Sequence, residues 1–307
     1  MRNMYIYSKI IDILKYDIET FSIERENPSF KSSLSHLKVL QKCYFFLARF
    51  ISNNSENQQL LHPYLKETFL KHIKTIPEVN AGLFIKQFLK NNKNVLSNLN
   101  ELNLIIYPIV NSIDKLDSKN RVKINYLDSL KVTTKVFDRM YKSNQTQIIT
   151  NLCAREFTNV LLLCGEENVY SEMKTMVTSF NEKIDENSFE VFQCPQEINY
   201  LYVLLDLLAA TCKEENHATE SKCQNYINLK HLVNLIRLGE GCVQLRRSIF
   251  NFYFHAYLET ERDLTLDKEK IEEITSFLHE DLLNFSNNLS GTCFIGLRYK
   301  IFPYKII

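Results

Sequence analysis

Apolar residues recur at steps of three and four through almost the whole chain, and this spacing constrains the fold more than any other feature. Within residues 5–21 these positions are Ile6, Ile10, Ile13, Leu14, Ile18 and Phe21. Such a spacing places the side chains on one stripe of an α-helix. The pattern predicts further helices at residues 34–51, 61–73, 81–90, 99–113, 124–141, 148–164, 169–180, 198–212, 229–238, 243–258 and 271–285. The chain is therefore predicted to be all-α, with about a dozen helices.

The scarcity of turn residues supports the same fold class. Only 6 Gly and 6 Pro occur in 307 residues, whereas a β-sandwich or barrel needs turn residues about every 8–12 positions. The links between the expected helices are short, as is typical of antiparallel neighbours in a bundle or solenoid. Because the chain is longer than a typical domain of about 100–150 residues, it either divides into domains or extends as stacked repeats.

An internal repeat favours the stack. Residues 164–174 (CGEENVYSEMK) match residues 212–222 (CKEENHATESK) at six of eleven positions without gaps, at an offset of 48 residues, and each copy follows an apolar helix. HEAT and armadillo units repeat every ~40–47 residues. A weaker echo, residues 55–57, follows the helix that ends near residue 51. The predicted architecture is an armadillo- or HEAT-like α-solenoid with one continuous aromatic-rich core, and Leu208 is expected to lie in that core.

The repeated turn has residue types suited to helix ends. Gly165 can take the left-handed conformation that closes a helix, and the side chains of Asn168 and Asn216 can accept hydrogen bonds from free amides at the start of the next one. We interpret these residues as caps. The charged residues of the two copies, Glu166, Glu167, Glu172, Glu214, Glu215 and Glu220, lack the ligand spacing of a calcium-binding loop, so they are expected to be solvated.

Charge and cysteine usage exclude several classes of function. The formal net charge is +1, with 37 basic and 36 acidic side chains interspersed, so the chain lacks the basic excess of a nucleic-acid-binding protein. The eight cysteines are spread through a large chain, several within apolar stretches, which favours buried reduced thiols. No signal-peptide pattern or apolar run of ~20 residues occurs. The sequence predicts a cytosolic chain with no transmembrane segment and no nucleic-acid partner.

No motif of enzymatic chemistry is present. Phosphate-binding glycine loops, a nucleophile elbow and the zinc-protease helix motif are all missing. Ser35 with Lys38 forms an S-x-x-K pattern but has no partner motifs. Cys212, His217 and Cys223 include zinc-ligand types without a C-x-x-C pair, and we interpret them as packed thiols beside a surface histidine.

Two further groups of side chains were weighed as sites. His255, within an aromatic helix, is expected to be a core histidine. Lys230, Arg237, Arg246 and Arg247 would bind an anion only if they converged. We therefore expect no catalytic, cofactor-binding or metal-ligating residues and no cofactor.

Several segments resemble inositol trisphosphate receptors, in colinear order. Residues 204–223 (LLDLLAATCKEENHATESKC) carry the clearest resemblance, and residues 227–233 and 250–261 continue it. Upstream, residues 43–47 (CYFFL) and 54–61 (NSENQQLL) are similar to the start of the homology domain that these receptors share with ryanodine receptors. The resemblance covers roughly residues 37–263 and implies the central armadillo-type segment of the family, which is helical and relays conformational change toward the pore.

The resemblance also divides the chain into three expected parts. Residues 1–36 form an N-terminal amphipathic helix and linker, residues 37–263 form the receptor-homology-like solenoid, and residues 264–307 form a C-terminal helix and irregular tail. The chain shows no pore helices and no counterpart of the pocket that binds inositol trisphosphate. What is implied is a regulatory segment of a calcium-release channel on the cytosolic face of the endoplasmic reticulum, with neighbouring channel domains as partners and a tetramer only in the full channel.

A free-standing armadillo-like scaffold that binds a protein or peptide partner in the cytoplasm is the alternative. A channel segment should leave an apolar end uncovered, whereas a free scaffold should have polar terminal helices and be monomeric. The first predicted helix has a polar, solvent-facing side with Lys9, Asp12, Lys15 and Glu19, but Asp17 interrupts its apolar side. Both hypotheses remain open at this point.

Overall fold

The computed structural model describes residues 2–24, 34–117, 120–157, 159–161, 175, 196–239, 242–260 and 268–290. By packing, the chain forms two units, Met1–Asp263 and Leu264–Ile307. In the described part of the first unit nearly every element is helical. The predicted all-α solenoid is confirmed.

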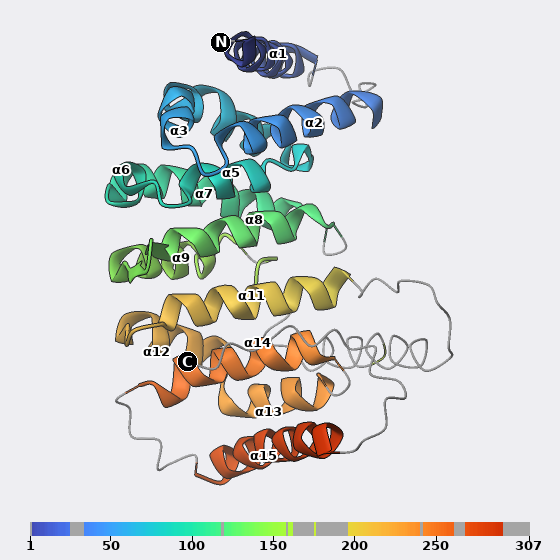
Figure 1. The fold of residues 1–307 in the computed structure, drawn as a ribbon, viewed down its shortest axis with the longest axis vertical. Coiled ribbons are helices and arrows are strands. Elements are labelled where there is room, and N and C mark those ends of the chain that lie inside the picture. The colour runs from blue at the N-terminus through green and yellow to red at the C-terminus, as the bar shows by residue number, and fades with distance from the viewer. Residues whose placement is uncertain are drawn as a thin grey trace. The chain divides into compact units, whose positions relative to one another are not determined.

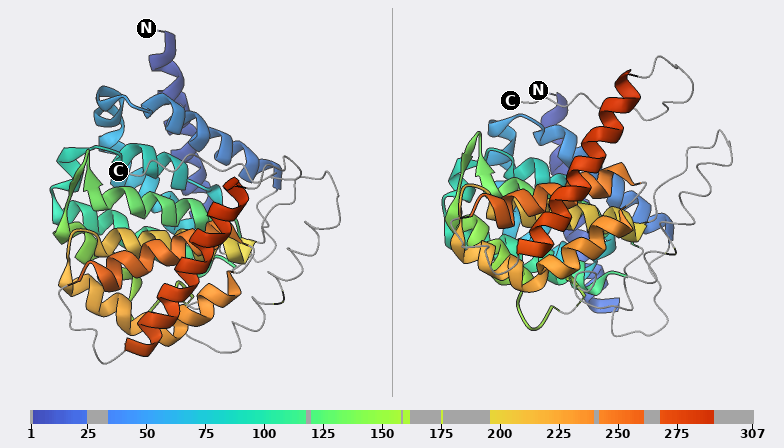
Figure 2. Two further views of the ribbon diagram at one scale, coloured as in Figure 1. Left: turned by 60° about the horizontal axis from the view of Figure 1, so that its bottom comes forward. Right: turned by 90° about the horizontal axis from the view of Figure 1, so that it is seen from below.

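A row of five helices packed side by side in chain order runs through the first unit (Figure 1). Its members are α2 (Leu34–Ile51), α5 (Gly82–Leu89), α8 (Val122–Lys131), α11 (Gln196–Cys212) and α14 (Val243–Tyr253). Tipping this unit brings its successive helices one behind another (Figure 2). The first three members, α2, α5 and α8, begin about 40–50 residues apart, as the units of stacked helical repeats do.

A second row packs against the first. Its members are α4 (Lys71–Thr75), α7 (Leu99–Lys115), α9 (Lys142–Leu152) and α12 (His217–Tyr226), which also contact one another in order. Shorter helical elements join the rows: α3 (Ser55–Leu61), η1 (His62–Tyr64), η2 (Leu65–Leu70), η3 (Pro77–Val79), α6 (Lys93–Leu96), η4 (Val132–Thr134), α13 (Leu229–Leu238) and η6 (Phe254–Leu258). Helix α1 (Arg2–Glu24) lies at the N-terminal end of the stack, against α2, η2 and α4.

The core lies between the two rows. Helix α7 shows how the sequence builds it: Asn98 caps the helix by accepting a hydrogen bond from the Glu101 amide at 3.3 Å. The apolar residues of one face of the helix are buried, namely Leu102, Ile105, Ile106, Ile109, Val110 and Ile113. Their removal from water is the main contribution of this helix to stability. Leu208 of α11 is also buried, as predicted.

A glycine sets the spacing between α5 and α8. A Cβ atom at Gly82 would lie 2.5 Å from the carbonyl carbon of Asn125 and 2.8 Å from the amide nitrogen of Tyr126. These are backbone atoms of α8, which cannot move aside as a flexible side chain can. The two helices pack this closely because residue 82 has no side chain.

Several predicted segments differ from the structure, three of them clearly. The helix expected at residues 124–141 ends at Lys131 and is followed by a small hairpin of β1 (Lys135–Val136) and β2 (Arg139–Met140). The helix expected at 148–164 begins earlier and ends at Leu152, and residues 153–157 form turns. The single helix expected at 61–73 changes its hydrogen-bonding pattern three times within 55–75. In this last segment all four elements are helical, and apolar spacing does not separate α, 3₁₀ and π turns.

The second unit contains one described element, α15 (Lys268–Ser290). It ends five residues beyond the helix expected at 271–285. Residues 291–307, the first copy of the internal repeat with Gly165 and Asn168, and nearly all of the helix expected at 169–180 lie outside the described residues.

Candidate functional site: the turn edge of the stack

Three of the links that follow first-row helices share one conformation. We call the links at residues 52–54, 90–92, 132–141 and 213–216 the turn edge. In three of them, the residue two positions before the next helix has a left-handed backbone conformation: Asn53 (φ 54°), Asn91 (φ 58°) and Glu215 (φ 58°). Asparagine tolerates this conformation better than most residues. The residue that follows is Asn54, Asn92 or Asn216.

Neighbouring links are bonded to each other. The Lys90 ammonium donates to Asn53 Oδ1 at 3.3 Å, and the Phe137 amide donates to Asn91 Oδ1 at 2.8 Å. Further along, the Lys142 ammonium donates to the Glu215 carbonyl at 3.1 Å. Each bond joins residues about 40–70 positions apart in sequence, so the turn edge fixes the order of successive repeats.

Buried side-chain amides make a second set of bonds between repeats. We call Gln58, Asn144, Gln145, Asn216 and Gln224 the amide ladder; all five are buried. Gln58 of α3 donates to the carbonyls of Gln87 and Lys90 at 2.8 and 3.2 Å. These carbonyls end helix α5 and have no partner within it. One glutamine thereby satisfies the C-terminus of the next first-row helix.

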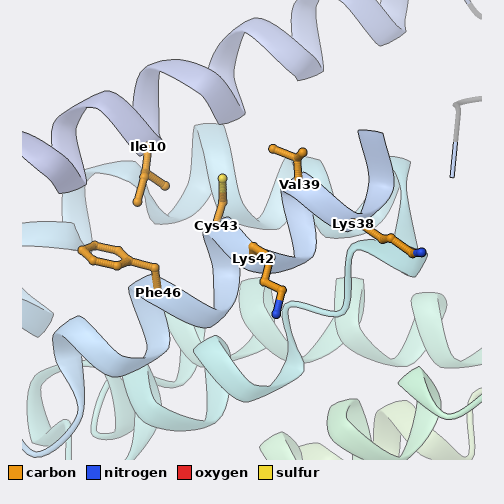
Figure 3. Close-up of a pocket in the computed structure, with 6 residues that line it drawn as sticks. All are labelled: Ile10, Lys38, Val39, Lys42, Cys43 and Phe46. Atoms are coloured by element: carbon orange, nitrogen blue, oxygen red, sulfur yellow. The ribbon is translucent and has the colours of Figure 1, made fainter. Parts of the chain in front are cut away.

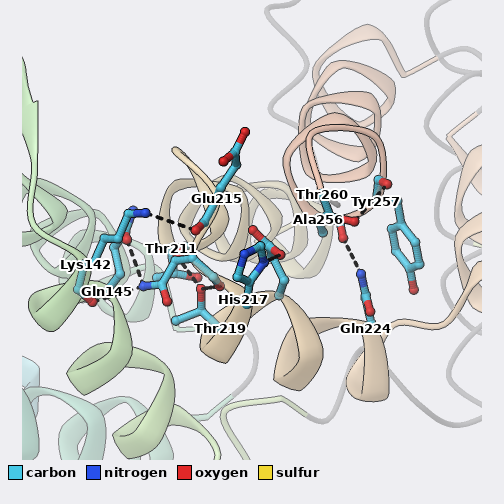
Figure 4. A network of polar contacts seen from close by, with 12 residues as sticks. Lys142, Gln145, Thr211, Glu215, His217, Thr219, Gln224, Ala256, Tyr257 and Thr260 are labelled. Carbon is cyan, nitrogen blue, oxygen red and sulfur yellow. Dashed lines mark hydrogen bonds and ion pairs between the residues drawn. The ribbon is translucent and has the colours of Figure 1, made fainter. Parts of the chain in front are cut away.

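The same arrangement recurs further along the stack. Gln145 of α9 donates to the Ala210 and Lys213 carbonyls, at 3.1 and 2.9 Å, at the end of α11. On α12, Gln224 donates to the Ala256 carbonyl at 2.6 Å, within η6 at the end of α14. Figure 4 shows the bond from Gln224 to Ala256, with Gln145 on the neighbouring helix α9. At three places along the stack, a buried glutamine therefore donates to a carbonyl at the end of a first-row helix.

The role predicted for Asn216 is wrong. Asn216 does stand at the start of α12, but its side chain accepts no capping hydrogen bond. Its Nδ2 group instead donates to the Lys142 carbonyl at 3.0 Å and to Gln145 Oε1 at 2.9 Å, both on α9. Contact with the neighbouring repeat outweighs local capping here. Side-chain caps do occur at Asn54, Asn92, Asn98 and Asn228.

The prediction that all the acidic residues of the turn are solvated fails at one position. Glu214 and Glu215 are exposed, but Glu220 is buried. Its Oε2 atom lies 3.1 Å from His217 Nδ1, and its Oε1 atom has no hydrogen-bond partner. Glu220 is the fourth residue of α12, just as Gln58 is the fourth residue of α3 and Gln145 is the fourth residue of α9. It thus occupies the ladder position with a group that cannot donate when ionised.

The cysteines near this turn are packed thiols. Cys212 and Cys223 are buried and free, and Cys223 Sγ lies 3.9 Å from Thr211 Oγ1. The neighbouring Cys212 thiol, together with burial, raises the pKa of Cys223 well above its usual value. His217 is exposed beside them. Among the described residues, no group of three His, Cys, Asp or Glu side chains is arranged to hold a metal ion.

The remaining residues considered from sequence lie apart from the turn edge. Ser35 and Lys38 are exposed on α2. His255 is partly buried in η6, with Nδ1 against the Glu259 carboxylate, so its nitrogen is satisfied locally, as expected. The basic residues Lys230, Arg237 and Arg247 are exposed on α13 and α14, while Arg246 lies over the Phe250 ring at 6.0 Å.

A buried ionic cluster that sequence reasoning missed attaches the N-terminal helix. Asp17 of α1 is buried; its Oδ2 atom lies 2.9 Å from Nε2 of the buried His72, and its Oδ1 atom contacts His36. His72 Nδ1 in turn lies 3.1 Å from the Tyr44 hydroxyl. Burial alone would raise the pKa of Asp17, but hydrogen bonds and charge from His72 and His36 outweigh burial and hold it below its ordinary value.

The Asp17 cluster and the amide ladder share one signal in the sequence, a polar residue on an apolar stripe. Asp17 interrupts the apolar stripe of α1, and Gln58 and Gln145 stand on the stripes formed with Leu61 and with Ile148. A polar residue on an apolar stripe must find a buried partner. The stripe can be read from sequence, whereas the partner, tens of residues away, cannot.

Comparison with known proteins finds similarity to a much longer receptor. No known family model matches the chain. The chain is similar to the inositol 1,4,5-trisphosphate receptor itr-1 of Caenorhabditis elegans, with 24% identity over 290 residues. The match covers 92% of this chain but only 9% of the relative's length. The chain is related to a segment of an inositol trisphosphate receptor, and the resemblance found in its sequence is confirmed. No helix among the described residues is both long and apolar enough to cross a membrane.

Proposed function

We propose, from its similarity to one segment of an inositol trisphosphate receptor, that this chain is a non-catalytic coupling segment of a receptor-like intracellular calcium-release channel. In this role it relays conformational change between the ligand-binding and pore regions. The observation that carries the proposal is the match of nearly the whole chain to a small part, 9% of the length, of a much larger receptor. A segment of that kind acts through the other parts of the receptor.

The bonding along the stack supports a relay. In a solenoid each repeat contacts only its neighbours, so displacement at one end passes through every interface in turn. The amide ladder joins α3 to α5, α9 to α11 and α12 to η6 through buried hydrogen bonds. Buried and fully satisfied polar contacts resist slippage because breaking one leaves a desolvated carbonyl unpaired.

We further propose an armadillo-type repeat for the stack, a place on the cytosolic face of the endoplasmic reticulum and neighbouring channel domains or subunits as partners. The surface of α1 supports this assignment over the free scaffold. Tyr5 and Tyr16 are 79% and 70% exposed, and Ile6 and Ile13 are also exposed. A free scaffold was expected to end in a polar helix, whereas a segment covered by its neighbours can keep such apolar side chains.

The test is made in the source cell. The native protein is tagged, its mass is measured, and calcium release evoked by inositol trisphosphate is recorded in permeabilised cells. We expect Gln145→Leu to reduce calcium release at saturating ligand without changing ligand affinity, because the relay is loosened while the binding region is intact. The exposed Gln59→Leu change is the matched control. A native product of about 36.2 kDa, free of membranes and without effect on release when deleted, would support the scaffold instead.

A further inference from the structure

An open groove lies between α1 and α2 at the N-terminal end of the stack. It has a volume of about 380 Å³ and is lined by Ile10 of α1 and by Lys38, Val39, Lys42, Cys43 and Phe46 of α2. In Figure 3, Val39 and Cys43 point toward α1, and Ile10 points toward α2. The lining is almost wholly apolar, although Val39 is 54% exposed.

The groove remains open because α2 is the first member of its row. Each of α5, α8 and α11 has a row neighbour on both sides, whereas α2, within the described part of the chain, has α5 on one side and only the crossing helix α1 on the other. Phe45 of α2 is also half exposed beside this surface. The uncovered side is therefore shaped by helices and suited to a further helix.

The charge at the groove is of one sign. Lys38 and Lys42 are one helical turn apart, both are exposed, and their stems line the groove while the ammonium groups project away from α1. Among the described residues neither forms an ion pair. By contrast, helices that lie side by side in this stack pair lysine with aspartate: Lys86 of α5 contacts Asp128 of α8, and Lys131 of α8 contacts Asp206 of α11 at 2.8 Å.

We propose that this groove binds an amphipathic acidic helix of a protein partner. Leu- or Ile-type side chains of that helix fill the space between Ile10, Val39 and Phe46, and Asp or Glu residues spaced by four meet Lys38 and Lys42. Residues four apart lie on the same helix face, so two lysines at this spacing fit a helix better than a single lipid headgroup. The proposal rests on the proposed function only in taking the partner to be a protein.

The experiment uses a displayed pool of helical peptides with a constant leucine face and the other positions randomised among Glu, Gln and Lys. The full chain and its Lys38→Glu/Lys42→Glu variant each select from this pool. We expect the wild-type chain to enrich peptides with acidic residues spaced by four, and the variant to bind them about tenfold or more weakly and to enrich lysine peptides instead. A Lys213→Glu/Lys230→Glu variant, with the same charge change at exposed distant sites, should behave as wild type.

Three results would overturn the proposal: no enrichment over background, enrichment without charge bias, or the same peptides selected by the wild-type and Lys38→Glu/Lys42→Glu chains. Self-association at micromolar concentration that this double variant abolishes would make the occupant a second copy and would also overturn it. Thermal unfolding of each variant verifies folding. Failure here with an intact calcium-release result would remove the groove as the interface and leave the proposed function standing.

Discussion

The turn edge and the N-terminal end of the stack are held by different chemistry. At and beside the turn edge, neutral amides of the ladder such as Asn216 and Gln145 are buried and each meets two or more acceptors. At the N-terminal end, α1 is attached through the charged Asp17 between two histidines, and an apolar groove beside it stays open. The amide contacts do not depend on protonation, whereas the N-terminal end is titratable at Asp17 and leaves a surface available.

The sharpest test of this contrast places the same substitution in both regions. Leu208→Asp should destabilise the chain by about 3–5 kcal/mol, because it puts a carboxylate at a position that is 2% exposed. Val39→Asp, in the groove, should change the free energy of unfolding by no more than about 0.5 kcal/mol. Chemical denaturation followed by circular dichroism measures both. Equal effects would mean that the groove is part of the core.

The close approach of α5 and α8 gives the next largest effect. Gly82→Ala should cost about 2–3 kcal/mol, because the new Cβ meets backbone atoms of α8 that cannot yield without moving the helix. Gly239→Ala is the control: its Cβ would meet first the Arg246 Cγ atom, at 3.0 Å, on a flexible side chain. Urea unfolding should show the smaller loss at Gly239. The reverse order would remove Gly82 as the spacer between repeats.

Breaking one rung tests the amide ladder directly. Gln145→Leu should cost about 2–3 kcal/mol, because it leaves the Ala210 and Lys213 carbonyls and the Asn216 amide short of partners. Gln59→Leu, on the exposed side of α3, should be nearly neutral. Both losses are read from thermal unfolding. If the two variants unfold alike, the ladder does not stabilise the stack.

The N-terminal end should respond to acid, whereas the ladder should not. Because the folded-state pKa of Asp17 lies below its ordinary value of 3.8, its stabilisation is present above about pH 3.8 and is lost as the pH falls through the folded-state value. Asp17→Asn should cost about 1–2 kcal/mol at pH 7.

Unfolding of the wild-type and Asp17→Asn chains is then compared from pH 7 down to pH 3. The difference between them should begin to shrink below pH 3.8 and disappear as the pH falls through the lower folded-state pKa of Asp17, because the wild-type side chain is uncharged only below that value. A difference that stays constant with pH would show that the carboxylate charge does not hold α1.

The smallest expected effect is a gain in stability. Glu220→Gln should stabilise the chain by about 0.5–1 kcal/mol, because a glutamine at this ladder position can donate where the buried Oε1 atom of Glu220 has no partner. The exposed Glu214→Gln change serves as its matched control. A loss of stability at Glu220 in denaturant unfolding would mean that the contact with His217 requires the carboxylate.

Sequence periodicity predicted the helices with strong, unbroken stripes. Helices α5, α7, α11 and α13 lie within about two residues of their predicted bounds. It failed where the chain turns within an apolar stretch, as at the β1–β2 hairpin after Lys131. There Val136 and Met140 are buried at a spacing that also fits a helix, so local pattern cannot distinguish the two.

The sequence by itself determined the all-α class, the stacked organisation and the places where polar residues interrupt apolar stripes, because these depend on spacing along one chain. Only the tertiary structure decided the partners of those residues: His72 for Asp17, the α11 carbonyls for Gln145, and α9 rather than its own helix for Asn216. Such pairings depend on how helices 40–70 residues apart approach each other. That geometry is set by side-chain packing across the whole core, and no local pattern encodes it.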